Sequence, residues 1–144
     1  MQFPGIVVGL SHTLTRTISE REVMGNFWHS AVDNLLSTPA LVSMMVEAST
    51  TLVDSRLPDG FISVGKRSVN IHEHPSVLGA HLRLTMEISH FDGYHIELSM
   101  HAEDDSGSIA HGIHVRSIVN KRWMQIKINK RISDTLHSVG RHRP

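Results

Sequence analysis

The stretch Ser37–Val53, STPALVSMMVEASTTLV, constrains the fold more than any other part of this chain. Its apolar residues recur at helical spacing and also occupy the opposite side, which is typical of a helix buried inside a domain. Pro39 suits the first helical position, where its missing N–H costs nothing, and Thr38 suits the N-cap before it. The stretch is too short and too rich in Ser and Thr to span a bilayer. We therefore expect one buried helix around which the other elements are arranged.

A single charged residue, Glu47, lies within this apolar stretch. A carboxylate in a buried helix is costly unless it is paired or hydrogen-bonded, and an unpaired one takes up a proton instead. We therefore expect Glu47 to have a histidine or arginine partner, either within the chain or across a dimer.

Alternating apolar residues predict five strands in the remainder of the chain. A capping box, Ser19-x-x-Glu22, predicts a short helix that runs to about Met24 after the first strand. The aperiodic stretch Gly25–Asn34 that follows is interpreted as a loop or a broken helical turn. Asp92-Gly93 is a strong hairpin signal. The four later strands are expected to form an antiparallel meander. The predicted strands are His12–Ile18, Phe61–Ile71, Ala80–His90, Tyr94–Ala102 and Ile109–Val119.

The C-terminal part carries a basic segment from Lys121 to about Lys130, which Asn120 can cap as a helix. With 144 residues, the chain suits a single domain, which we place at residues 1–132, followed by a loose tail at residues 133–144. A buried helix followed by an antiparallel sheet predicts an α+β fold in which the sheet wraps around the helix. The free face and edge of such a sheet need cover, which favours a homodimer or a higher homo-oligomer.

The overall composition excludes several classes of function. The formal net charge is zero, which gives no indication of a nucleic-acid partner or an acidic membrane surface. The chain has no cysteine, so disulfides, thiolate metal sites and a cysteine nucleophile are excluded, and a cytoplasmic location is expected. Its twelve histidines are scattered without HExxH or a similar ligand spacing, so neither a metal nor a cofactor is expected.

Three segments, taken in order, carry a family resemblance. They are Thr38-Pro39-Ala40-Leu41 with the Met-rich turn after it, Val64-Gly65 through Asn70-Ile71-His72 to Gly79, and Gly112-Ile113-His114-Val115-Arg116, which has the pattern G-x-H-x-R. Together they resemble hotdog-fold thioesterases, and within them the group of fluoroacetyl-CoA thioesterase. The likeness covers roughly residues 12–130. It implies a hotdog fold, in which an antiparallel sheet wraps around a long central helix.

The resemblance also implies catalytic positions. Thr38 falls on the family's catalytic threonine and His72 on its catalytic histidine, so hydrolysis of an acyl-CoA or acyl-carrier thioester is expected. The family's catalytic glutamate lies eight residues after the threonine, where this chain has Val46, and Glu47 follows one place later. Because one residue on a helix is a turn of roughly 100°, Glu47 is a catalytic base only on condition that its side chain reaches the site.

Each candidate residue also has a plainer structural interpretation. A threonine before a proline is an ordinary N-cap, and a histidine at a strand end is often merely solvated. For substrate binding we name Phe27 and Trp28 as a lid over an acyl pocket, although aromatic residues over a core are more often packing. The remaining substrate-binding candidates are Gly79, His114 and Arg116. His114 and Arg116 lie on one face of a strand and form either a structural pair or a ligand contact.

Three functions remain open at this point. The first is thioester hydrolysis of an acyl-CoA-type substrate at a pocket on a dimer interface. The second, motivated by Val46, is a non-catalytic hotdog protein that binds acyl-CoA or a small apolar ligand. The third is a hotdog hydratase or dehydratase, but its usual pairing of Asp and His at a helix start is not evident. The basic C-terminal residues form a solvated face or contact CoA phosphates.

Overall fold

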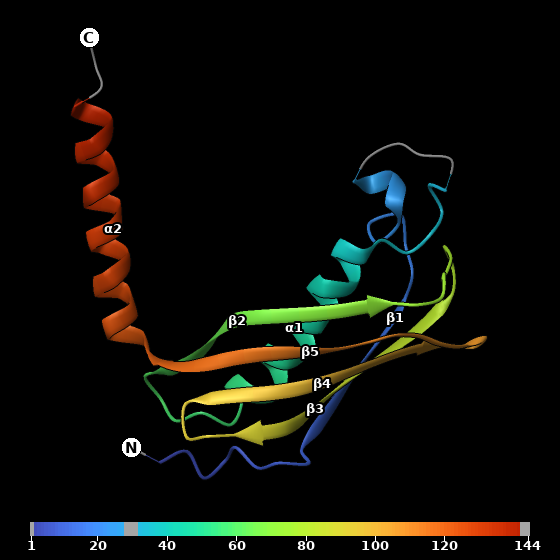
Figure 1. The fold of residues 1–144 in the computed structure, drawn as a ribbon, viewed down its shortest axis with the longest axis horizontal. Coiled ribbons are helices and arrows are strands. Elements are labelled where there is room, and N and C mark those ends of the chain that lie inside the picture. The colour runs from blue at the N-terminus through green and yellow to red at the C-terminus, as the bar shows by residue number, and fades with distance from the viewer. Residues whose placement is uncertain (1, 28–31, 142–144) are drawn as a thin grey trace.

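The computed structural model describes residues 2–27 and 32–141 of the chain, as a five-stranded antiparallel sheet with two long helices (Figure 1). The helices are α1 (Thr38–Asp54) and α2 (Lys121–Arg141), and a short 3-10 helix, η1 (Met24–Asn26), lies before α1. This is the predicted α+β class. The strands are β1 (Ser11–Thr17), β2 (Phe61–His72), β3 (His81–Phe91), β4 (His95–Asp104) and β5 (Gly107–Asn120).

The strand order in the sheet is β1-β3-β4-β5-β2. The predicted meander is confirmed for β3, β4 and β5, but it is wrong for β2, which pairs with β5 and ends the sheet. The reason lies in the connections, because tight turns join β3, β4 and β5, whereas the longer segment 73–80 carries the chain from β2 across the sheet to β3. Phe61 of β2 lies opposite Asn120, and His72 lies opposite Ala110. The far edge of β2 is therefore an edge of the sheet.

The core forms between α1 and one face of the sheet. Leu41, Met45 and Ala48 of α1 have no exposed surface and belong to the same buried cluster as alternate residues of the strands. The intervening strand residues point to the other face and are mostly polar, as expected for an antiparallel sheet with one solvated side. The buried residues of β3 are Leu82, Leu84, Met86 and Ile88, and those of β4 include Ile96, Leu98, Met100 and Ala102.

The side of α1 that faces away from the sheet is open. Pro39, Ser43, Glu47 and Thr51 recur every fourth residue and are exposed. The side chain of Glu47 is 51% exposed and pairs with Arg16 of β1, whose guanidinium lies 3.0 Å from the carboxylate. The expected partner is therefore present, but the prediction that Glu47 is buried is wrong, because α1 packs against the sheet on one side only.

The segment after β1 contains the contacts of the predicted capping box. The Ser19 N–H donates to Glu22 Oε2 at 2.9 Å, and the Ser19 hydroxyl contacts the same oxygen. The predicted short helix is nevertheless wrong, because the chain there forms a turn and then pairs with the residues that lead into α1. The Ser37 N–H donates to the Glu22 carbonyl at 2.8 Å, and Val23 forms an isolated bridge with Leu36. This pairing fixes the start of α1 against the end of β1.

The second helix is longer than predicted. Asn120 accepts the Trp123 N–H at 3.1 Å, so the predicted cap is confirmed. We expected the helix to end near Lys130 and the chain to be loose from Ser133, but the helix continues to Arg141. α2 leaves the end of β5 and projects away from the sheet, beyond the rest of the domain (Figure 1).

Candidate active site

Two adjacent hydroxyl groups begin α1, and they have different roles. Ser37 is the N-cap, since its fully buried Oγ accepts the Ala40 N–H at 3.1 Å. Thr38 is the first helical residue and is exposed, so the prediction of Thr38 as N-cap is wrong by one residue. Because Ser37 already caps the helix, the hydroxyl of Thr38 is left for another partner.

That partner is His72, the last residue of β2. Thr38 Oγ1 and His72 Nδ1 lie 3.2 Å apart, although 34 positions separate the two residues in the sequence. The other ring nitrogen, Nε2, is buried and has no hydrogen-bond partner in the described part of the chain. Burial lowers the pKa of His72 below the ordinary value of 6.5, so the imidazole is neutral at neutral pH. A neutral imidazole with an unused nitrogen can accept a proton and return it.

Asn70 is a polar residue of this region that the sequence analysis did not select. It lies two residues before His72 on β2, so both side chains are on the same face of the strand. Both polar atoms of its amide are buried without a partner among residues 2–27 and 32–141. A buried polar group left unpaired costs about 1–3 kcal/mol, so such a group is usually kept for a purpose. The signal in the sequence was an amide between Val69 and Ile71 in a strand.

The start of α1 can also stabilise negative charge. Helix N-termini carry a partial positive charge and N–H groups that lack partners within the helix. Pro39 has no N–H and the Ala40 N–H is taken by Ser37, so among the described residues the Thr38 N–H is the donor left in this first turn. A thioester oxygen that gains negative charge during hydrolysis would be stabilised at this position.

A hollow of about 720 Å³ opens beside the start of α1. Pro39 and Ser43 of α1 line one side of it, and Phe27, which is 41% exposed, lies in another wall. Arg16, which pairs with Glu47, and Arg21 bring positive charge to the same hollow, and Glu22 brings negative charge. Trp28, the other predicted lid residue, lies outside the described residues.

His114 and Arg116 are buried side by side on β5, with 1% and 4% of their surfaces exposed. Arg116 Nη1 lies 3.1 Å from His114 Nε2, and a guanidinium can only donate, so this ring nitrogen accepts and the ring proton is on Nδ1. Nδ1 in turn faces Ser68 Oγ at 2.8 Å. Arg116 also donates to Ser63 Oγ at 2.7 Å and to the Ser63 carbonyl at 2.9 Å. Burial and the Arg116 charge lower the pKa of His114. The pair is thus held by contacts between β2 and β5.

Gly112, the glycine of the G-x-H-x-R pattern, is explained by the close packing of two strands. A Cβ at Gly112 would lie 2.1 Å from the Val69 carbonyl oxygen, so only glycine allows β5 to approach β2 this closely. Gly65 is less restricted, because a Cβ there would lie 3.3 Å from Cε1 of His114 and that ring could shift slightly. Gly112 is therefore the glycine that the close pairing of β2 and β5 requires.

Two other predicted site residues lie apart from the Thr38–His72 pair. Glu47 follows Thr38 by nine residues, or about 13.5 Å along the helix axis at 1.5 Å per residue, and its carboxylate contacts Arg16. Gly79 has a φ of +88° and donates its N–H to the Ile18 carbonyl at 2.8 Å. A glycine suits this left-handed conformation in the turn before β3. Within one chain, the structure brings together Thr38, His72 and Asn70, but not Glu47.

The fold and the position of this pair define a class of protein. A central helix wrapped by an antiparallel sheet is shared with a hotdog-like protein from Thermanaerovibrio acidaminovorans, at 28% identity and a TM-score of 0.83, covering 88% of this chain and 93% of that one. A Thermus thermophilus member of the thioesterase superfamily has 15% identity and a TM-score of 0.82, covering 92% and 97%. The fluoroacetyl-CoA thioesterase FlK has 18% identity and a TM-score of 0.79, covering 87% and 96%. The fold is therefore the hotdog fold, as predicted.

Residues 18–122 match the family of the fluoroacetyl-CoA-specific thioesterase FlK, and the chain belongs to this family. The family and the fold are those of thioester hydrolases. None of the curated proteins matches the chain at the level of sequence. In the described residues, no helix is long and apolar enough to cross a membrane, and no group of three or more His, Asp or Glu side chains is arranged to hold a metal ion.

Proposed function

We propose that this protein hydrolyses an acyl-CoA or acyl-carrier thioester at a pocket that a homodimer forms beside the start of α1. The contact between Thr38 Oγ1 and His72 Nδ1, at 3.2 Å, carries this proposal, together with the buried and unpartnered Nε2 of the same ring in the described chain. An FlK variant has been solved with acetyl-CoA, which supports the substrate class.

A single hydrogen-bond arrangement serves both steps of hydrolysis. The His72 Nδ1–H donates to Thr38 Oγ1, which leaves the Thr38 hydroxyl proton for the thioester oxygen and the Nε2 lone pair for water. As the water oxygen attacks the carbonyl carbon, Nε2 takes up its proton. The carbon–sulfur bond then breaks, and the imidazolium returns the proton to the leaving thiolate. The Asn70 amide, on the same strand face as His72, orients the water.

The proposed dimer forms along the free edge of β2. A strand at a sheet edge has unpaired N–H and C=O groups, and in the described chain β2 pairs only with β5. Two identical edges related by a two-fold axis pair in antiparallel fashion. Because His72 ends β2, each site would lie beside the second copy.

The other candidates keep their proposed places around this pocket. Phe27 and Trp28 form the lid. Gly79, His114 and Arg116 support the substrate-binding walls indirectly, through the turn before β3 and the β2–β5 pairing that they hold. Glu47 remains a conditional base, which acts only where its carboxylate can leave Arg16 and reach a site of either copy. We place the protein in the cytoplasm, where acyl-CoA substrates are found and a chain without cysteine is at no disadvantage.

Thiol release from a panel of short and aromatic acyl-CoA thioesters tests this function. Thr38→Ala and His72→Ala should each lower the rate by at least about tenfold, because each removes a group that contacts the reacting atoms. His74→Ala and Thr51→Ala are matched controls, since both residues are exposed and lie near the same elements. Full activity in the Thr38 and His72 variants across the whole panel would contradict the proposed site.

A non-catalytic ligand-binding role is the second candidate function, and two observations favour it. Val46 occupies the position of the family's acid, and the Glu47 carboxylate is engaged by Arg16. Saturable binding of acyl-CoA without thiol release above background would establish this role. Turnover that depends on His72 would exclude it.

A further inference from the structure

The helix α2 presents an apolar surface that nothing in the described chain covers. A groove of about 420 Å³ runs along one side of the helix. Ile128, Ile132 and Leu136 line it and are 42%, 54% and 67% exposed. We refer to its apolar residues as the α2 stripe. The stripe consists of Met124, Ile128, Ile132 and Leu136.

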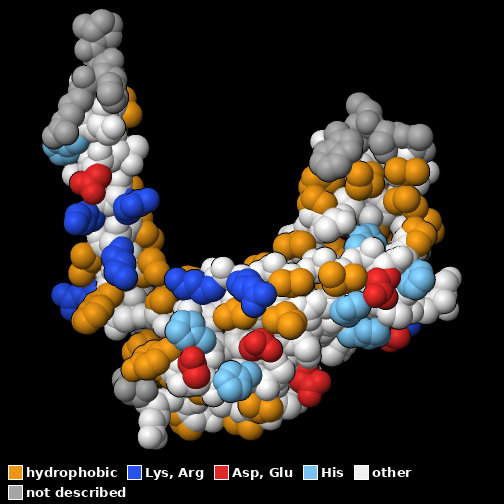
Figure 2. All heavy atoms as spheres, viewed as in Figure 1, with side chains coloured by type: hydrophobic (Ala, Val, Ile, Leu, Met, Phe, Trp, Pro, Cys, Tyr) orange, Lys and Arg blue, Asp and Glu red, His pale blue; other side chains and the backbone are white. Residues whose placement is uncertain are grey.

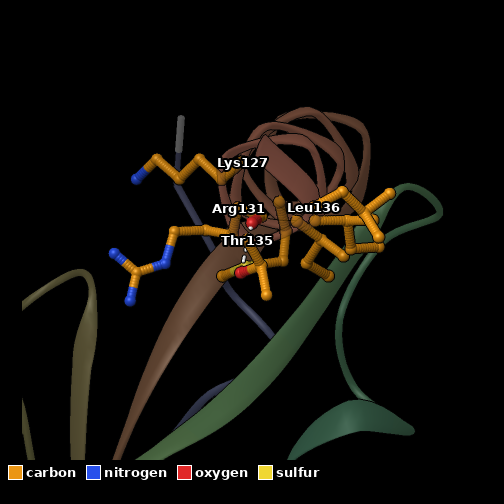
Figure 3. A pocket seen from close by; sticks show the side chains of 7 residues that line it. Lys127, Arg131, Thr135 and Leu136 are labelled. Carbon is orange, nitrogen blue, oxygen red and sulfur yellow. Dashed lines mark hydrogen bonds between the residues drawn. The ribbon is translucent and has the colours of Figure 1, made fainter. Parts of the chain in front are cut away.

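The α2 stripe faces the open space between α2 and the start of α1. Figure 1 shows α2 at one end of the sheet, the start of α1 with η1 at the other end, and β2 along the open side between them. In Figure 2, hydrophobic side chains gather on the side of α2 that borders this space, and basic side chains cover much of the rest. Figure 3 shows Lys127 and Arg131 pointing to one side of the groove and Leu136 to the other.

The charge of the chain is divided between α2 and the body. Residues 1–120 contain seven Lys or Arg against thirteen Asp or Glu, and residues 121–144 contain seven against one, so their formal charges are −6 and +6. The body of a second copy therefore attracts α2, whereas two α2 helices repel each other. The family match ends at residue 122, close to the start of α2.

We propose that the α2 stripe packs against the body of a second copy of this chain, beside that copy's Thr38–His72 pair. This inference rests on the proposed dimer. Asn120, which precedes α2, lies opposite Phe61 at the start of β2. In an antiparallel pair of β2 strands, the start of one lies next to the end of the other, which is His72.

The length and the charge of α2 agree with this contact, and we call α2 in this role the arm. A helix of 21 residues is about 31 Å long, which is enough to cross the end of a neighbouring domain. The end of the body that carries His72 also carries the acidic residues Glu20, Glu22 and Glu73, together with Arg16 and Arg21 of the hollow. Lys127 and Arg131, beside the stripe, provide the opposite charge. Each site would then be closed partly by the helix of the other subunit.

Sedimentation equilibrium of the full chain tests the arm. The double variant Ile128→Glu/Ile132→Glu should raise the dimer dissociation constant by at least about tenfold, because it places two charges in the buried contact. Ile126→Glu is the matched control, since Ile126 is 60% exposed but lies outside the stripe, and it should change the constant by less than about twofold. A double variant that dimerises like the unaltered chain overturns the arm, and leaves thioester hydrolysis to its own test.

A thiol introduced at position 132 identifies what covers the stripe, because the chain has no cysteine of its own. In Ile132→Cys, labelling by a maleimide should slow at least about tenfold when the protein dimerises, while Ile126→Cys is labelled at one rate throughout. Disulfide formation between two Ile132→Cys chains would show that α2 pairs with α2, and overturns the proposal. Equal labelling in monomer and dimer, with binding to phosphatidylserine vesicles that the double variant loses, assigns the stripe to a membrane and also overturns it. A chain that stays monomeric at all concentrations overturns the proposed dimer and the arm together.

Discussion

The two long helices carry similar apolar stripes in opposite surroundings. Leu41 and Met45 of α1 are completely buried against the sheet, whereas Ile132 and Leu136 of α2 are more than half exposed. α1 lies within the fold and its apolar surface is satisfied by its own chain. α2 leaves the sheet after β5 and contacts little else.

The groups that lack a partner beside each helix differ in kind. At the start of α1 the unsatisfied groups are polar and buried, namely His72 Nε2 and the Asn70 amide, for which the described chain offers no partner. On α2 they are apolar and exposed. Unpaired buried polar groups are costly and mark chemistry, whereas an exposed apolar surface marks association. The comparison separates a site that acts on a substrate from a surface that meets another protein.

The largest expected effect compares a buried residue of α1 with an exposed residue of α2. Met45→Lys should lower the free energy of unfolding by at least about 4 kcal/mol, because it places an unpaired charge where no surface is exposed. Ile126→Lys on α2 should change it by less than about 0.5 kcal/mol. Urea unfolding followed by circular dichroism measures both, and equal losses would break the distinction between the helices.

Asn70 tests whether polar groups near α1 are kept at the expense of stability. Asn70→Leu should raise the free energy of unfolding by about 1–3 kcal/mol, since it removes two buried groups that lack partners in the described chain, and should also slow hydrolysis. Asn129→Leu, on the exposed surface of α2, is the control. A loss of stability in the Asn70 variant would mean that its amide is already satisfied.

Variants of the two adjacent hydroxyl residues at the start of α1 should separate helix capping from catalysis. Ser37→Ala should lower the free energy of unfolding by about 1 kcal/mol, because Ser37 caps the helix, and should leave most of the hydrolysis intact. Thr38→Ala should slow hydrolysis and leave the free energy of unfolding nearly unchanged. Thermal unfolding and thiol release are measured on the same two variants. A larger loss of stability in Thr38→Ala than in Ser37→Ala would contradict the assignment of Ser37 as the N-cap.

The smallest expected effect is on the dependence of stability on pH. Burial lowers the folded-state pKa of His72 and His114 below the ordinary 6.5, so near and below that pH the unfolded chain binds more protons. Stability should therefore fall as the pH drops through this window. His114→Gln should make the fall shallower than in the control His137→Gln, which changes an exposed residue of α2. Urea unfolding between pH 7.5 and about 5 measures the slope, and the same slope in both variants would argue against a lowered pKa.

Much of the secondary structure could be predicted because it depends on local patterns. Alternation along β3 and β4 reflects one buried face, and Leu41, Met45 and Ala48 recur at helical spacing, so both signals lie within a few neighbouring residues. The capping box is the informative exception. Ser19 and Glu22 make the expected contacts, but pairing with the chain before α1 prevented a helix.

The amino-acid sequence alone predicts a long apolar helix that starts near Pro39, antiparallel strands around it, and a threonine and a histidine as candidates at its start. Contacts between distant segments make Ser37 the cap, bring His72 to Thr38 across 34 positions, and place β2 at the end of the sheet beside β5. These outcomes depend on which distant segments pack together, and the free energy of such contacts cannot be predicted from the spacing of neighbouring residues. The same reason explains the exposed stripe of α2, because the described chain offers no surface that covers it.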